Sequence, residues 1–235
     1  MNTGSDHLTE KDRLSIIILK VDVTGDVMNK HWFSNKTYNA CYRFKTWIRT
    51  EYYNLRNRMR LNSTGVVYSD DIITSGKLII SNCGQITIGK GVAINSGSYP
   101  NPVGTSNTRI YTYDSNSKIF IGNNVGMSNV LLFAKEEISI GDDTMIGAET
   151  MIIDTDFHGV DIELIDGKYN REEEKSKPIH IGKNCFIGTG CKILKGVTVG
   201  DNSAVGAGSV VTKSIPSNQV WAGNPAIFLR DVNIK

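Results

Sequence analysis

Aliphatic residues recur at every sixth position over much of this chain. The clearest run consists of Ile181, Ile187, Ile193, Val199, Val205 and Val211. Glycine directly follows several of them, as in Ile187-Gly188 and Val205-Gly206. A period of six matches neither the 3.6-residue turn of a helix nor the two-residue alternation of a simple strand. It predicts a chain that turns a corner every six residues, with one aliphatic side chain pointing inward from each short strand.

Three such strands close a triangular coil of about 18 residues, and stacked coils pair their strands in parallel. The phase returns upstream at Ile140, Ile146 and Ile152, at Ile121, Met127 and Phe133, at Ile88 and Ile94, and more weakly at Val67, Ile73 and Ile79. Valine and isoleucine pack well on such sheets, and glycine can adopt the backbone angles of a tight corner. The pattern therefore predicts an all-β solenoid, a parallel β-helix, over residues 63–215.

The phase is lost in two places, which predicts two extruded loops at residues 95–118 and 153–178. Loops that leave a solenoid commonly build its binding surface. The second one includes a charged segment, Asp166 to Lys177, which we expect at the rim of a site. A step of seven between Phe133 and Ile140 predicts a one-residue bulge at Glu136-Glu137.

The two ends of the chain do not follow the repeat. Residues 1–62 are predicted to form an appendage with a strand at Leu14–Val23 and a basic helix over 34–60, capped by Ser34. The helix either contacts an anionic lipid or phosphorylated carrier, or is a solvated helix that caps the solenoid. Residues 216–235 are expected to pack back on the last coil.

Composition narrows the class of protein. The chain has 235 residues with 23 glycines, 5 prolines and a formal net charge of +2. These values exclude collagen-like chains, and the small charge disfavours nucleic acid as a partner. No segment resembles a membrane span or a signal peptide, so we expect a cytoplasmic protein. None of the 4 cysteines forms a CxxC pair, and Cys185 and Cys191, six apart, are expected to be buried packing residues.

The stretch Val205-Gly-Ala-Gly-Ser-Val-Val-Thr-Lys213, with the later Ala222-Gly-Asn-Pro-Ala226, resembles the hexapeptide-repeat acyltransferases. The resemblance covers about residues 65–230 and is strongest to the maltose and galactoside O-acetyltransferases and the O-acetyltransferases of surface polysaccharides. It implies a left-handed β-helix, a handedness that the period alone does not reveal. It also implies a homotrimer, with acetyl-CoA bound between coils of two subunits.

Acyl transfer to a hydroxyl needs a base that takes the hydroxyl proton, and histidine titrates in the right range. His158, in the sequence Asp154-Thr-Asp-Phe-His158, resembles the catalytic histidine of this family. Asp154 or Asp156 could orient it or bind a sugar hydroxyl, and Glu149 is a further orienting candidate. The chain has no G-x-S-x-G motif, so direct attack in a ternary complex is simpler than a covalent serine route.

The resemblance also implies a set of acetyl-CoA contacts. The matching positions are Gly188, Thr189, Ala207, Thr212, Lys213 and Arg230. Thr189 and Ala207 lie one coil apart and would stack along one groove. Gly188 would let the pantetheine arm approach the backbone, Lys213 would contact acetyl-CoA, and Arg230 would reach a CoA phosphate.

The acceptor side departs from the family pattern. Phe186 stands where many relatives have tryptophan, and Lys135 lies where an acidic residue is usual. The sugar acetyltransferases also have an asparagine in this part of the chain, and the asparagine nearest to that position here is Asn129. The maltose or galactoside assignment therefore does not transfer directly.

These features predict an acetyl-CoA-dependent O-acetyltransferase acting on a saccharide, without a metal. Two alternatives stay open: an N-acetyltransferase of an amino sugar nucleotide, and a non-catalytic solenoid that binds a ligand. A carbonic anhydrase on the same solenoid would need three zinc-binding histidines, and only His158 and His180 lie in the repeat region.

Overall fold

The computed structural model describes residues 35–98, 101–159, 162–165, 168–171 and 175–233. The chain divides into two units, Met1–Thr46 and Trp47–Lys235. The first is described only over the beginning of helix α2 (Asn35–Ser63). The predicted strand at Leu14–Val23 and the predicted cap Ser34 lie outside the described residues.

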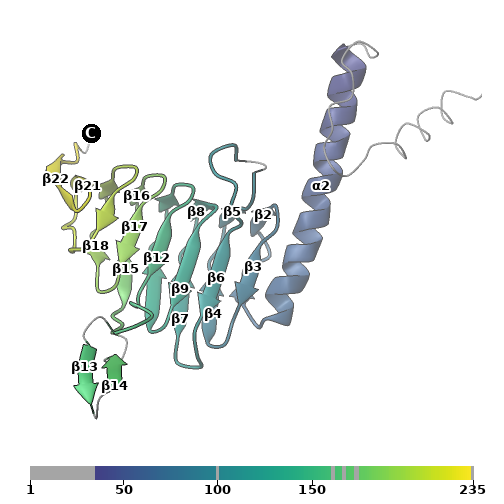
Figure 1. The fold of residues 1–235 in the computed structure, drawn as a ribbon. Coiled ribbons are helices and arrows are strands. Elements are labelled where there is room, and N and C mark those ends of the chain that lie inside the picture. The colour runs from purple at the N-terminus through teal and green to yellow at the C-terminus, as the bar shows by residue number, and fades with distance from the viewer. Residues whose placement is uncertain (1–34, 99–100, 160–161, 166–167, 172–174, 234–235) are drawn as a thin grey trace, which may run out of the picture. The chain divides into compact units, whose positions relative to one another are not determined.

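The second unit is built from three sheets whose strands follow one another in rotation along the chain (Figure 1). Sheet A contains β1 (Val67–Tyr68), β4 (Gln85–Ile88), β7 (Lys118–Ile121), β10 (Glu137–Ile140), β15 (Ile179–Ile181) and β18 (Thr198–Val199). Sheet B contains β2 (Ile73–Ser75), β5 (Ala93–Asn95), β8 (Gly126–Ser128), β11 (Met145–Ile146), β16 (Phe186–Ile187), β19 (Ala204–Val205), β21 (Gln219–Gly223) and β22 (Ala226–Asp231). Sheet C contains β3 (Ile79–Ser81), β6 (Arg109–Thr112), β9 (Leu131–Ala134), β12 (Met151–Ile153), β17 (Lys192–Leu194) and β20 (Val210–Val211).

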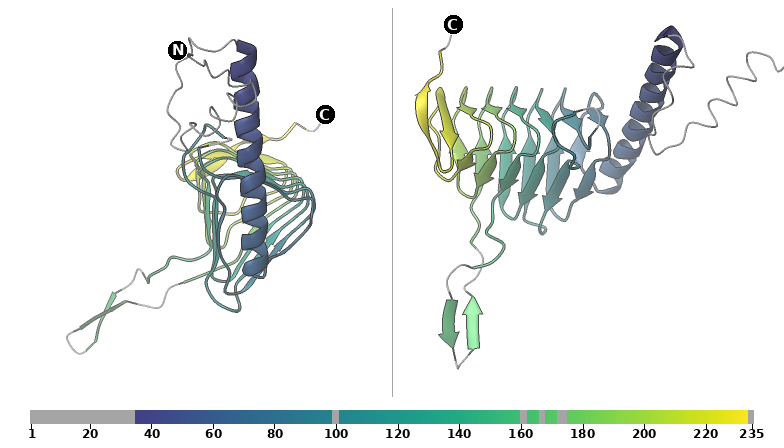
Figure 2. Two further views of the ribbon diagram at one scale, coloured as in Figure 1. Left: turned by 90° about the vertical axis from the view of Figure 1, so that its right-hand side faces the viewer. Right: turned by 45° about the horizontal axis from the view of Figure 1, so that its top comes forward.

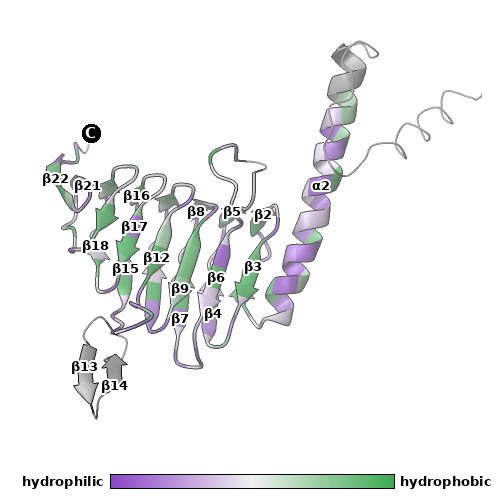
Figure 3. Ribbon diagram, in the orientation of Figure 1, coloured by the Kyte–Doolittle hydropathy of each residue, from purple (hydrophilic) through white to green (hydrophobic). Residues whose placement is uncertain are grey.

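Strands in each sheet pair in parallel with the coil before and after, except for the antiparallel final pair β21 and β22. The predicted parallel β-helix is therefore confirmed. We call its three edges AB, BC and CA, after the sheets that each corner joins in chain order. The strands are coloured mainly as hydrophobic, while α2 is mixed (Figure 3).

Two side chains from each corner-to-corner segment enter the core. One is the aliphatic residue of the six-residue period, and the other lies two positions before it, as in Cys185 with Ile187 and Cys191 with Ile193. Both thiols are buried, as predicted, and burial raises the pKa of each. The period thus describes only half of the core, and the smaller inward residue completes each layer.

The predicted phase is wrong in the first coil and at Phe133. Val67 and Ile73 are 62% and 61% exposed, while their neighbours Val66 and Ile72 are buried. At the next irregularity, Leu132 is buried and Phe133 faces outward.

The shift at Phe133 comes from the BC corner at Asn129. Met127 and Leu132 pair with Ile146 and Ile152, so this corner is one residue shorter than the corner of the next coil. The expected bulge at Glu136-Glu137 is wrong as well, because Glu137 begins β10 and pairs in register with Lys118.

The glycines after the inward aliphatic residues are needed for space and not for unusual backbone angles. A Cβ atom on Gly188 would lie 2.5 Å from the backbone nitrogen of Ala207 in the next coil. The positive φ angles fall two residues later, for example at Asn184 (φ 52) and Asn202 (φ 58). The AB corners from Gly89 to Gly200 likewise combine a glycine that leaves room for its neighbour with a residue in the left-handed region.

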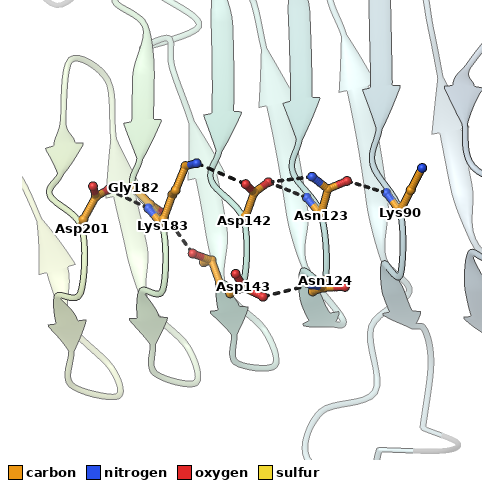
Figure 4. A network of polar contacts seen from close by, with 9 residues as sticks. Lys90, Asn123, Asn124, Asp142, Asp143, Gly182, Lys183 and Asp201 are labelled. Atoms are coloured by element: carbon orange, nitrogen blue, oxygen red, sulfur yellow. Dashed lines mark hydrogen bonds and ion pairs between the residues drawn. The ribbon is translucent and has the colours of Figure 1, made fainter. Parts of the chain in front are cut away.

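Edge AB carries a continuous ladder of polar contacts (Figure 4). The Asn123 amide oxygen accepts from the Lys90 nitrogen at 2.9 Å, and Asp142 accepts from the Asn123 nitrogen at 2.8 Å. Asp142 also pairs with the Lys183 ammonium at 3.3 Å, and Asp201 accepts from the Lys183 nitrogen at 2.7 Å. Side chains at this edge therefore satisfy the backbone of adjacent coils.

The end of α2 covers the first coil. Asn57 is fully buried, and its side-chain nitrogen donates to the Gly76 carbonyl at 2.8 Å while its oxygen accepts from the Leu78 nitrogen at 3.2 Å. Leu61 is buried beside it, and Arg60 donates to the Ile80 carbonyl at 2.7 Å. Among the described residues, no helix combines the length and apolarity needed to cross a bilayer.

Two segments leave the coils. The range 95–118, predicted as one loop, contains strand β6, because Ile110 pairs with Ile80 and Leu132 inside the solenoid. The extruded part is therefore 96–108. Residues 154–178 leave edge CA, and within them β13 (Ile162–Ile165) and β14 (Lys168–Arg171) form a hairpin outside the three sheets (Figure 2).

Candidate active site

The base of the second extruded segment is anchored at Asp154. This residue is fully buried, and its two carboxylate oxygens accept from the backbone nitrogens of Lys135 at 2.7 Å and Glu136 at 2.8 Å. Burial raises the pKa of Asp154. Because these oxygens bind the CA corner of the preceding coil, Asp154 anchors the start of the extruded segment to the solenoid.

The next residues hold the segment's two arms together. Thr155 forms a bridge with Ser176, and the Asp156 nitrogen donates to the Lys175 carbonyl at 3.2 Å. The Asp156 carboxylate pairs with the Lys195 ammonium of the next coil. His158 follows as an exposed side chain. These contacts of the two aspartates lead to the scaffold and not to the histidine.

Edge CA continues past His158 with positive charge. Lys195 lies one coil further along and Lys213 two coils further, each in the corner that leaves sheet C. Thr212 and Lys213 are exposed and line a shallow pocket with Trp221, Pro225, Ala226, Ile227 and Phe228. Strands stack at about 4.8 Å, so two coils separate this pocket from the His158 corner by about 10 Å.

Sequence reasoning missed Lys195. The repeat could have identified it, because Lys195 precedes Lys213 by one 18-residue coil and therefore lies on the same edge.

Gly188, Thr189 and Ala207 lie on a different edge, BC, between strands of sheets B and C. Thr189 is half-buried, Ala207 is exposed, and the Gly208 nitrogen donates to the Thr189 carbonyl at 2.8 Å. The space above Gly188 is occupied by the next coil. The chain therefore brings His158, Thr212 and Lys213 to edge CA, while Gly188, Thr189 and Ala207 lie together on edge BC.

The remaining cofactor candidate is Arg230. It is exposed on β22, in sheet B, and its guanidinium donates to the Asp231 carbonyl at 2.9 Å.

Edge BC also binds the first extruded segment. Asn129 is buried, and its side-chain nitrogen donates to the carbonyls of Gly97, at 3.1 Å, and Ser106. Among the described residues, its side-chain oxygen has no hydrogen-bond partner. Asn129 therefore lies beside the 96–108 segment and not beside the His158 corner.

Glu149, a candidate to orient His158, has a different position and different contacts. It lies on edge BC, and its carboxylate accepts from the nitrogens of Thr105 at 2.9 Å and Ser106 at 3.0 Å and from the Ser106 hydroxyl at 2.7 Å. Burial opposes ionisation, but these hydrogen bonds outweigh it and lower the pKa of Glu149. Within one copy, Glu149 therefore holds the 96–108 segment and lies on a different edge from His158.

Comparison with known proteins supports the repeat. The family model "Hexapeptide repeat of succinyl-transferase" matches residues 137–163 and 178–213. The chain is 40% identical over 124 residues to galactoside O-acetyltransferase of Escherichia coli K12, covering 52% of this chain and 58% of that protein. It is 37% identical over 105 residues to galactoside O-acetyltransferase of Lactococcus lactis, covering 45% and 48%. The matches thus span about half the length of these curated relatives.

Among solved structures, AntD of Bacillus cereus, an N-acyltransferase in complex with dTDP and 3-hydroxybutyryl-CoA, superposes with a TM-score of 0.52. The identity is 19%, and the match covers 75% of this chain and 88% of that one, which establishes a common fold. The resemblance to hexapeptide-repeat acyltransferases and the left-handed parallel β-helix are therefore confirmed.

Proposed function

We propose that this chain is an acetyl-CoA-dependent O-acetyltransferase that modifies a saccharide hydroxyl. The observation that carries the proposal is the arrangement of edge CA. His158 is exposed at a corner anchored by Asp154, and Thr212 and Lys213 follow two coils later on the same edge. The identity to galactoside O-acetyltransferases over 124 and 105 residues supports the same reaction class.

In the proposed reaction, His158 acts as a general base. Its imidazole takes the proton from an acceptor hydroxyl while that oxygen attacks the thioester carbonyl of acetyl-CoA. The tetrahedral intermediate collapses, the carbon–sulfur bond breaks, and the CoA sulfur leaves with the proton held by His158. An acetyl ester and CoA result, with no covalent enzyme intermediate.

Acetyl-CoA would be held from two edges. Lys213 and Arg230 would contact its phosphates, while Thr189, Ala207 and the backbone at Gly188 would line the pantetheine arm. Gly188, Thr189 and Ala207 lie on edge BC of a chain, whereas His158 and Lys213 lie on its edge CA, so a single copy offers two half-sites. We infer a homotrimer in which edge BC of one copy faces edge CA of the next.

For the acceptor, Asp156 is the better placed of the two aspartates, since it is exposed beside His158 whereas Asp154 is buried against backbone. Asn129 is less well placed for the acceptor, because its side chain is buried and its nitrogen donates to the carbonyls of Gly97 and Ser106.

A contact of α2 with an anionic membrane or lipid-linked acceptor is supported by the helix's outward face. Ile48, Tyr52, Leu55 and Met59 recur at helical spacing and are 47%, 60%, 64% and 64% exposed. They lie opposite Asn57 and Leu61, which face the first coil. Arg49 and Arg56 lie along one side of these exposed side chains, and basic residues beside an apolar face are typical of helices that lie in an anionic interface.

The reaction is tested by incubating the purified chain with acetyl-CoA and a panel of methyl glycosides, amino sugars and oligosaccharides, and measuring free thiol release and product mass. We expect ester formation on a saccharide hydroxyl. Transfer only to amines would replace the proposal with the N-acetyltransferase alternative. Binding of a saccharide without any transfer would favour the non-catalytic solenoid.

The membrane contact is tested by co-sedimentation with vesicles of neutral phospholipid alone or of neutral phospholipid mixed with phosphatidylserine, which makes the surface negative. We expect binding to anionic vesicles that Leu55→Ser with Met59→Ser abolishes. Val67→Ser, an equally exposed position on the solenoid, is the control. Equal sedimentation of all three proteins would contradict the contact.

A further inference from the structure

Four aromatic rings gather outside sheet C, at the end that leads into edge CA. Tyr111 and Tyr113 belong to one coil, Phe133 to the next, and Phe157 to the segment that carries His158. The Phe133 ring centroid lies 6.3 Å from Tyr111, 6.4 Å from Tyr113 and 4.7 Å from Phe157. Tyr113 and Phe157 are 54% and 42% exposed. We call these four residues the aromatic cluster.

The cluster is held in place by its surroundings. Phe157 has a φ of 61°, a conformation that a bulky residue rarely adopts, and its nitrogen donates to the Thr155 hydroxyl at 3.2 Å. Its ring packs edge-on against Phe133, whose strand β9 pairs in register with β6 and β12. The residue that precedes His158 is therefore fixed to the cluster, and the rings are presented on a rigid sheet.

The position of the cluster along edge CA indicates what it binds. Thr212 and Lys213, the candidate donor contacts, lie in coils after His158, and the cluster lies in coils before it. An acceptor must reach the thioester from the side that CoA leaves open. The two sides of the His158 corner thus differ in chemistry: cationic toward the C-terminus and aromatic toward the N-terminus.

The rim of the cluster is polar. The Lys135 ammonium lies 5.3 Å from the Tyr113 ring centroid, and the Tyr113 phenol adds a donor and acceptor. A pyranose ring has the matching character, with an apolar face of C–H bonds and hydroxyls around its rim. Aromatic surfaces bordered by a few polar groups are typical of small-ligand sites.

We propose that the aromatic cluster is the acceptor subsite and stacks against a pyranose ring whose hydroxyl faces His158. The proposal rests on the acetyltransfer function proposed above. It names Tyr113 and Phe157 as the residues that determine affinity for the sugar, with Phe133 as their support.

The test compares Tyr113→Ala with Phe120→Ala, an aromatic residue 48% exposed on sheet A. With methyl β-D-galactopyranoside or the best acceptor of the panel, we expect Tyr113→Ala to raise the acceptor KM about tenfold. The kcat at saturating acceptor and the KM for acetyl-CoA should stay within about twofold. Tyr113→Phe should retain most of the affinity, and Phe120→Ala should match the wild type.

Equal acceptor KM values for Tyr113→Ala and the wild type would overturn the proposal while leaving the transfer reaction standing. A change in oligomeric state of Tyr113→Ala, measured by light scattering, would also overturn it and assign the cluster to a subunit interface. If the wild type transfers acetyl to no sugar, the proposed function fails separately. Saturation-transfer NMR with the same glycoside then tests the cluster directly: binding weakened by Tyr113→Ala supports it, and unchanged or absent binding overturns it.

Discussion

Edges AB and CA of the same solenoid differ in regularity. At AB, the corners from Gly89 to Gly200 repeat one pattern, a glycine, a polar residue and a residue of positive φ. The side chains of Asn123, Asp142, Lys183 and Asp201 there contact adjacent coils. At CA, the corners vary from the two residues 135–136 to the long segment 154–178. The contrast shows that a repeated hydrogen-bond pattern uses up its polar groups in stabilising the coils, whereas an irregular edge leaves side chains available for chemistry.

The largest expected effect separates the two solenoid histidines. His158→Ala should lower kcat by about 10²–10⁴-fold because the general base is lost, with acetyl-CoA affinity and thermal stability retained. His180, whose Nδ1 lies 2.7 Å from the Ser139 hydroxyl on sheet A, is the matched control, and His180→Ala should stay within about twofold in activity. Steady-state kinetics and acetyl-CoA titration measure both. A similar fall of kcat in both variants would contradict the assignment of the general base to His158 on edge CA.

The next effect concerns stability at edge AB. A Cβ atom on Gly182 would lie 2.3 Å from the Asp201 carboxylate and 2.7 Å from its backbone nitrogen. We expect Gly182→Ala to lower the free energy of unfolding by about 1–3 kcal/mol, as overpacking does, without changing kcat of the folded protein. Urea unfolding measures the change. Lys183→Ala, which removes only a surface ion pair, should cost under about 1 kcal/mol, and a similar cost for both variants would contradict the packing explanation.

A pH-dependent effect is expected at edge BC. The pKa of Glu149 is lowered by its contacts with Ser106 and Thr105, so the ionised carboxylate stabilises the folded state. This stabilisation is present above the ordinary glutamate pKa and is lost as the pH falls through the lowered one. Glu149→Gln should therefore melt below the wild type at pH 7, with the difference shrinking in acid. Asp143→Asn at edge AB is the control, and a melting difference for Glu149→Gln that is constant with pH would argue against the assignment.

The smallest expected effect concerns one set of side-chain hydrogen bonds between coils at edge AB. The Asn202 side chain accepts from Asn184 at 2.9 Å and donates to Asn218 at 3.0 Å, and its φ is 58°. Asn202→Ala should cost about 1 kcal/mol through the lost hydrogen bonds and the left-handed backbone. Asn202→Gly, which relieves the backbone strain, should cost less in the same unfolding experiment. Equal costs would show that the backbone angle contributes little.

The sequence predicted the regular part of the molecule well, because one period repeats from Ile181 to Val211 with every member buried. It failed where a corner changed length, as at Asn129, since a single missing residue moves the inward position from Phe133 to Leu132. It also could not assign Glu149 to its edge, because the contact with Ser106 joins residues 43 positions apart. The aromatic cluster was missed for the same reason: its rings come from three separate coils and share no local motif.

The segment at residues 154–178 enters and leaves the solenoid without disturbing it. Strand β12 still pairs with β9 and β17, and β15 with β10 and β18, in unbroken register on both sides of the insertion. The coils therefore do not depend on the inserted segment, and hairpins of different length and sequence can replace it while the core is unchanged. Grafting the corresponding segment from a relative would be a direct route to a new acceptor preference on the same frame.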